Sequence, residues 1–153
     1  MITQRMILDA VNLQLVSLGH GWAVHRDALP EQFERPCWFI SAEEQERTVM
    51  TRFSDDVKQK INILCIGNLN EDNKGNADEL TAMADEVIML FTNDGFVRVD
   101  DRCLKIDGIK AKRTAEDGFN VELNLAFTDD ARLETEKLPT MQDIRFKNKI
   151  AKE

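Results

Sequence analysis

The chain has 153 residues, 28 of them acidic and 20 basic, and its formal net charge is −8. This length suits one domain with a single hydrophobic core, and the negative charge repels polyphosphate, which argues against a general nucleic-acid-binding protein. Because no apolar run approaches the roughly 20 residues needed to cross a bilayer, we expect neither a signal peptide nor a membrane span.

The chain opens with a helical pattern over residues 3–18. Thr3 is placed to cap the N-terminus of this helix, and Gly19 is placed to end it. Apolar side chains recur at the spacing that puts them on one face of an amphipathic helix: Ile7, Leu8, Val11, Leu15 and Leu18.

Extended segments follow the first helix. Residues 22–27 form a short strand-like segment, and RPCWFISA, residues 35–42, forms a better strand. A polar stretch, 43–49, separates it from a second extended run, 50–67. In the last half of that run, 61–66, the alternation is typical of a central strand covered on both sides. We predict that the two runs pair as a long antiparallel hairpin.

The clearest helical pattern follows a loop at 68–76. Asn76 and Glu79 stand at the spacing of a capping box, and Gly95 can take the left-handed conformation that ends a helix. The apolar positions between them share one helical face: Leu80, Met83, Ala84, Val87, Ile88 and Phe91.

Three further strands are predicted at 96–100, 103–113 and 118–127. Gly108 shifts the apolar phase of the middle strand, as a bulge does. The last strand alternates strictly, so one of its faces belongs to the core and the other to water. Residues 129–153 are a polar linker and a basic tail with few apolar anchors.

The order helix, strands, helix, strands predicts an α+β domain. We expect a mostly antiparallel β-sheet with two α-helices packed on one face, plus a C-terminal extension. Residues 1–128 form the single domain in this interpretation, and residues 129–153 form the linker and tail.

Nucleophilic catalysis would centre on a cysteine. Cys37 precedes Trp38 and Phe39 and could pair with His20 or His25. A lone cysteine that shares a strand face with an aromatic ring is, however, more often a core residue. Three cysteines at wide spacing favour reduced thiols in a cytoplasm. We therefore expect no catalytic residue and no enzyme.

Metal and cofactor sites have no convincing pattern either. The two histidines are five residues apart and do not fit the helical zinc spacing. Asn70, Asp72 and Gly75 imitate the start of a calcium loop, but Thr81 stands where a bidentate carboxylate is needed. No glycine-rich phosphate loop is present. We expect no metal ion and no cofactor.

Several short sequence segments follow one another in a fixed order along the chain. They are Pro36, Trp38, Phe39 and Ile40 after the first helix; Arg52; the alternating Ile61, Ile63 and Cys65; ADELTAMADEVIML, 77–90; KIDGI, 105–109; FNVELNLAF, 119–127; and Met141-Gln142. In this order they resemble the small tail terminator, or tail-completion, proteins of long-tailed bacteriophages and related prophages. The resemblance spans nearly the whole chain and contains no catalytic motif.

The resemblance implies a structural virion protein that caps the head-proximal end of the tail tube and offers the head-to-tail joining interface. It implies assembly as a homo-oligomeric ring, expected to be a hexamer, in the virion tail after a stage in the host cytoplasm. The expected partners are the tail tube protein and a head–tail connector or stopper protein. DNA passes only through the lumen, with no specific nucleic-acid binding and no membrane contact.

A closed ring needs two different complementary patches on each subunit. An exposed sheet edge can supply one patch by strand addition, and the tail can supply the other. We expect Trp38 and Arg52 at a subunit or connector interface. Within residues 138–153, Phe146 and Ile150 are expected to anchor the tail on a neighbour. Acidic residues facing the lumen would keep DNA from adhering.

Two other function classes stay open at this point. An acidic α+β chaperone or adaptor of a phage or bacterial assembly system would share the composition and the antiparallel sheet, but it should be a dimer that holds a disordered client. A thiol hydrolase would need an exposed Cys37 that is alkylated rapidly in the folded state.

Overall fold

The computed structural model describes residues 2–26, 31, 33–69, 77–115 and 118–129. Within these residues the chain forms two helices and six strands. In chain order they are α1 (Gln4–Val16), β1 (Val24–His25), β2 (Cys37–Val49), β3 (Asp55–Ile66), α2 (Ala77–Asp94), β4 (Phe96–Val99), β5 (Arg102–Ala115) and β6 (Gly118–Asp129).

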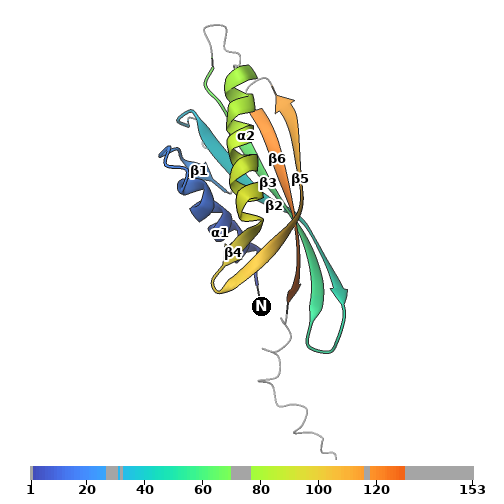
Figure 1. Cartoon of the computed structure of the whole chain (residues 1–153). Coiled ribbons are helices and arrows are strands. Elements are labelled where there is room, and N and C mark those ends of the chain that lie inside the picture. Colours follow the sequence, from blue (N-terminus) through green and yellow to red (C-terminus); the bar gives the residue numbers. More distant parts are fainter. Residues whose placement is uncertain (1, 27–30, 32, 70–76, 116–117, 130–153) are drawn as a thin grey trace, which may run out of the picture.

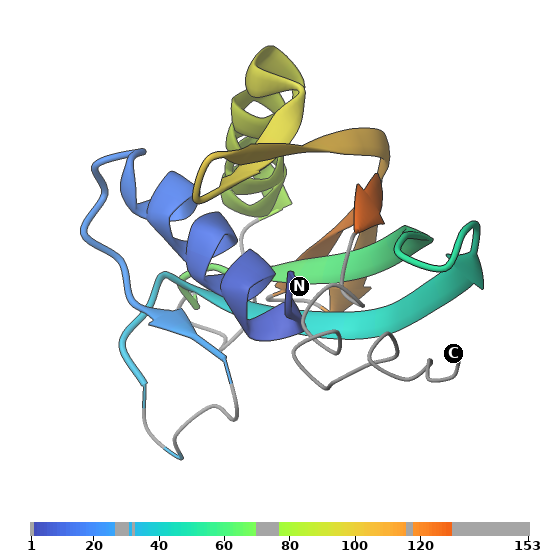
Figure 2. The ribbon, with the colours of Figure 1, turned by 90° about the horizontal axis from the view of Figure 1, so that it is seen from below.

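The strands form one sheet in the order β1-β2-β3-β6-β5-β4. Every neighbouring pair is antiparallel except β1 with β2, which is parallel. Both helices cover the same face of this strongly twisted sheet, as Figures 1 and 2 show from two directions. The predicted fold class, a mostly antiparallel α+β sheet with two helices on one face, is confirmed.

The core lies between the helices and the sheet. Each fully buried aliphatic side chain there contributes about 1.5–3 kcal/mol of stability. Alternate residues of β3 and β6 point into the core, because successive side chains of a strand lie on opposite faces. Its largest fully buried members in the helices and in these two strands are Ile7, Leu15, Leu80, Phe91, Ile61, Ile63, Leu123 and Leu125.

The helix boundaries largely follow the sequence signals. The Oγ1 atom of Thr3 accepts the N–H of Met6 at 3.2 Å, which caps α1 as predicted. Helix α1 ends at Val16, and Gly19 follows with φ = +81°. Helix α2 ends where expected, at Gly95 with φ = +74°.

The strand β2 is longer than predicted. We expected the polar stretch 43–49 to separate two strands, but it pairs with β3 as far as Val49, so this prediction was wrong. The stretch is polar because it lies on the hairpin beyond the cover of the helices (Figure 1). Glu44 and Glu46 are exposed on one face, while Gln45 and Arg47 on the other make polar contacts with Gln59 and Asp55. The amide of Gln45 donates to the side-chain oxygen of Gln59 at 2.8 Å.

The pairing of β2 and of β5 with its inner neighbour is irregular in places. The register of β2 with β3 shifts between Ala42 and Glu44, and that of β5 with β6 shifts first between Ile106 and Gly108 and again between Arg113 and Ala115. The shift between Ile106 and Gly108 confirms the bulge that Gly108 predicted. Each such shift exchanges the residues that face the core and bends the strand.

Candidate assembly surfaces

The described residues contain no thiol poised for catalysis. Cys37 and Cys65 are buried, and only Cys103 is exposed. Burial raises the pKa of Cys65 to about 12 and also raises the pKa of Cys37, against a smaller lowering by the charge of Arg35. A high thiol pKa leaves almost no nucleophilic thiolate at neutral pH.

The histidines are not placed as a base for Cys37. His20 lies 2.7 Å from a carboxylate oxygen of Glu86 and stacks on Trp22, with ring centroids 4.1 Å apart. His25 lies on β1, where it packs edge-on against Phe33. Within the described part of the chain, no hydrogen bond joins a histidine to a cysteine.

We expect iodoacetamide at pH 8 to alkylate one thiol of the folded chain, that of Cys103, and to reach Cys37 and Cys65 only after denaturation. Burial and a raised pKa protect the latter two. Mass spectrometry of peptides after a short reaction measures this, and the Cys103→Ser variant is the control that should take up no label. Rapid labelling of Cys37 would instead support the thiol hydrolase.

Neither metal nor membrane binding finds support in the described residues. No group of three or more potential ligands lies close enough there to hold a metal ion. The calcium-like loop falls mostly at 70–76, outside the described residues. Neither α1 nor α2 has the length and apolar character that a bilayer crossing requires, and the described residues contain no other helix.

Trp38 lies inside the subunit. Only 1% of it is exposed, and its ring is 5.0 Å from that of Trp22, centroid to centroid. It belongs to the same buried core cluster as residues of both helices and of β3. The sequence left open what this ring packs against. The structure places it on the helix-covered face of the sheet, with almost no area left for a neighbouring subunit.

Arg52 lies at the tip of the hairpin formed by β2 and β3. This tip extends past both helices in Figure 1 and points away from them in Figure 2. It carries exposed apolar side chains: Val49 is 69% exposed, Met50 57% and Phe53 41%. The guanidinium of Arg52 lies 5.6 Å from the centroid of the Phe53 ring. Apolar side chains exposed together on a projecting turn suit a contact with another protein.

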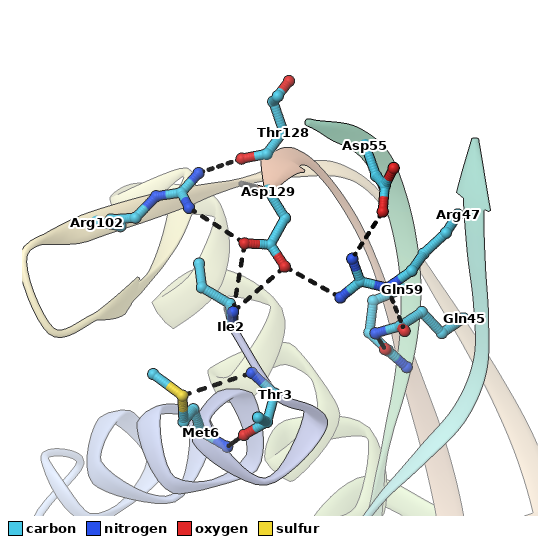
Figure 3. A network of polar contacts seen from close by, with 10 residues as sticks. All are labelled: Ile2, Thr3, Met6, Gln45, Arg47, Asp55, Gln59, Arg102, Thr128 and Asp129. Carbon is cyan, nitrogen blue, oxygen red and sulfur yellow. Dashed lines mark hydrogen bonds and ion pairs between the residues drawn. The ribbon is translucent and has the colours of Figure 1, made fainter. Parts of the chain in front are cut away.

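A buried carboxylate, Asp129, lies at the last residue of β6 (Figure 3). It is 0% exposed. Both of its oxygens accept the backbone N–H of Ile2 at 3.3 Å, and Nη2 of Arg47 lies 3.0 Å from Oδ2. Arg102 approaches Oδ1 at 3.7 Å. Asp129 therefore joins the start of α1, the hairpin and the β4–β5 turn at one point.

Asp129, Arg47 and Arg102 form a cluster of charged side chains, and its hairpin side contains a second carboxylate, that of Asp55. Arg47 lies between the two aspartates, with Nη1 at 3.4 Å from Oδ2 of Asp55. Two arginines thus face two aspartates, Asp55 and Asp129, so the buried charges balance. Arg102 also donates to the carbonyl of Thr128. Asp129 is the last residue that the structure describes at the C-terminal end of the chain.

The sequence did not predict this cluster, since Asp129 was assigned to the polar linker that begins at residue 129. A signal was nevertheless present, because the period of two that runs from Phe119 to Phe127 puts Asp129 on the core face. Phe146 and Ile150, the other predicted interface residues, lie outside the described residues.

Two long stretches of strand edge are unpaired within the described residues. The short β1 covers β2 only at Trp38 and Phe39. The short β4 covers β5 only along residues 102–105. The remainder of both strands, about 40–49 in β2 and 107–112 in β5, has no strand on its outer side among the described residues. Ala111 is exposed although it lies in line with the core-facing Val121.

The two open edges carry opposite charges on the face away from the helices. Glu44 and Glu46 project from β2, and Lys110 and Lys112 project from β5. All four are exposed. Open edges of this kind invite strand addition unless their charges oppose it.

A groove of about 380 Å³ lies on this polar face. Its charged lining contains as many lysines as acidic residues, so it offers no strongly charged site for a small ion. For the same reason, this groove alone is not an acidic surface of the kind expected to face the lumen. The charged residues that line it are Glu44, Glu46, Asp107, Lys58, Lys60 and Lys110.

A family model described as "Phage tail terminator protein" matches residues 6–137 of the chain. The match covers both helices and all six strands, apart from the first two residues of α1. No curated protein matches the chain.

Proposed function

Since the chain belongs to the phage tail terminator family, we propose that it caps the head-proximal end of a tail tube and provides the surface to which the filled head joins. The family makes it a structural component of a phage tail. The family match is the single observation on which this proposal rests. The folded chain agrees with it, because the described surface offers projecting and edge features suited to protein contacts and buries two of its three cysteines.

The subunits assemble in this proposal as a ring, expected to hold six copies, around the opening of the tube. A ring closes by rotation, so each subunit presents two different patches that fit each other. DNA passes through the lumen without a specific binding site, as the net charge of −8 favours. Assembly in the host cytoplasm precedes incorporation into the virion.

The axial contacts are proposed to come from two parts of the chain. The hairpin tip, with Arg52 beside Phe53, contacts a neighbouring virion protein, which is the tube protein or the connector. Residues 138–153, with Phe146 and Ile150 as apolar anchors, lie against an adjacent subunit or the connector. The hairpin tip and Asp129, the last described residue, lie at the same end of the sheet, because Val49 pairs with Asp55 and Asp55 with Asp129.

Tails made without this protein provide the test. We expect the purified full chain to add a ring of density at the head-proximal end of such tails in electron micrographs, and to make them competent to join filled heads. A chain lacking 138–153 should do so at least about tenfold less well, because the tail anchors would be lost. Tails that stay uncapped and inactive with the full chain would contradict the proposed function.

A further inference from the structure

We propose that neighbouring copies of this chain join edge to edge, with the open edge of β5 in one copy adding as an antiparallel strand to the open edge of β2 in the next. The inference rests on the proposed function in one respect, the closed ring. It goes further by naming the two edges, their direction and their register.

Strand direction supports this joint. The four long strands stand in the order β2, β3, β6, β5, and each is antiparallel to the next. The two outer strands of this set therefore run in opposite directions. Rotation about a ring axis to which the strands are tilted, as in a barrel, preserves the sense of each strand along that axis and staggers neighbouring copies along their strands, so β5 of one copy meets β2 of the next antiparallel.

The backbone groups that face outward can be assigned from two hydrogen bonds. Trp38 donates its N–H to Ala23 on the outer side of β2, at 3.0 Å, and Ile106 donates to Gly95 on the outer side of β5, at 3.1 Å. Outward-facing amides recur at every second residue of a strand. The irregularity at Ala42/Glu44 in β2 and the one at Ile106/Gly108 in β5 then shift the phase by one.

Past those irregularities, the outward amides of β2 belong to Gln45 and Arg47, and those of β5 to Ile109 and Ala111. Residues that exchange hydrogen bonds across a new joint must face each other directly. Pairing Gln45 with Ala111 places Arg47 opposite Ile109. Both pairs also match in side-chain direction, since all four residues lie in the rows of the sheet that face the helices.

This register aligns the charges on the opposite face. Glu44 comes to lie opposite Lys112, and Glu46 opposite Lys110. Sliding the strands by two residues in either direction breaks both pairs and leaves a single acid–base pair, either Glu46 with Lys112 or Glu44 with Lys110. Directly opposed charges of opposite sign stabilise antiparallel strands, and like charges destabilise them.

The charges also exclude the symmetric alternatives. Two β2 edges would bring glutamates together, and two β5 edges would bring lysines together. An isologous dimer through either edge is therefore disfavoured, and the head-to-tail joint is the attractive one. Such a joint repeats around a ring.

Charge reversal on each edge tests the proposal on tails that lack the protein. The first variant carries Lys110→Glu and Lys112→Glu, which makes both of its edges acidic. The second carries Glu44→Lys and Glu46→Lys, which makes both edges basic. Each alone should activate roughly 100-fold fewer tails than the wild type, because like charges then oppose each other at every joint. An equal mixture should restore activity to within about threefold, because the two variants can alternate around a ring.

A matched control separates the edges from the effect of net charge. The variant Asp85→Lys with Asp101→Lys changes the net charge by the same amount as Glu44→Lys with Glu46→Lys, at exposed positions away from both edges. Because both of its edges are unchanged, this control alone should activate tails to within about threefold of the wild type. A loss in the control as large as that in the basic-edge variant, or full activity of either edge variant alone, would overturn the proposal.

A disulfide tests the register. In a Cys103→Ser background, Glu46→Cys together with Lys110→Cys should yield disulfide-linked multimers when tail-bound protein is oxidised, while each single cysteine variant stays monomeric. If the wild-type chain and the double-cysteine chain both cap tails but the double-cysteine chain never cross-links, the edge joint is refuted and the proposed function stands. Wild-type chain that fails to cap tails would refute the function itself.

Discussion

Replacing Asp129 by alanine is expected to lower the free energy of unfolding by about 3 kcal/mol, the lower end of the loss seen when one partner of a buried ion pair is removed. The carboxylate is 0% exposed and accepts the N–H of Ile2. Without it, Arg47 and Arg102 keep their positive charges beside a buried void. Both arginines retain some contact with water, which holds the loss near the lower end.

Urea denaturation followed by circular dichroism measures this loss. Asp129→Asn should fall between alanine and the wild type, because the amide keeps the shape and can still accept a hydrogen bond while the charge is gone. Asp101→Ala, at an exposed turn, is the control and should change stability by less than about 0.5 kcal/mol. A stability loss in Asp129→Ala no larger than that control would mean that the cluster does not hold the sheet end.

Trp38→Ala is expected to cost about 3–5 kcal/mol, the range for removing a large buried aromatic side chain. The ring is 1% exposed and contacts Trp22 and the core between the helices and the sheet. Trp38→Phe should cost less, because it fills part of the cavity. The loss appears in the unfolding of the isolated chain, measured by far-ultraviolet circular dichroism.

This measurement distinguishes a core role from the interface role that the sequence suggested. Phe53→Ala at the exposed hairpin tip is the matched aromatic control and should leave the unfolding free energy within about 0.5 kcal/mol of the wild type. If Trp38→Ala were as stable as the wild type and yet failed to cap tails, Trp38 would belong to an interface after all.

The regular elements could be predicted from the sequence because their signals are local. Helix α2 follows from its apolar spacing and from Gly95, and the first irregularity in β5 follows from the phase shift at Gly108. The continuation of β2 through 43–49 could not be predicted in the same way. That segment has no apolar face, and its pairing depends on β3, which supplies backbone partners and Gln59.

For the assembly surfaces, too, local signals could be read from the sequence and long-range contacts could not. Arg52 was expected at an interface and lies on an exposed, partly apolar tip, since residues between two strands of a hairpin project by construction. Trp38 was assigned to an interface because both faces of its strand are apolar. Only the three-dimensional arrangement shows that the helices cover the Trp38 face. The cluster at Asp129 joins residues up to 127 positions apart, a separation that no local pattern encodes.

The hairpin tip and the end of β6 lie at one end of the sheet, where Val49, Asp55 and Asp129 stand in one row. Copies related by rotation all point the same way, so a ring of them would have two chemically different rims. One rim would repeat the apolar hairpin tip once per subunit. Repetition of this kind provides avidity, so that each single contact can be weak and reversible while the completed rim holds its partner firmly.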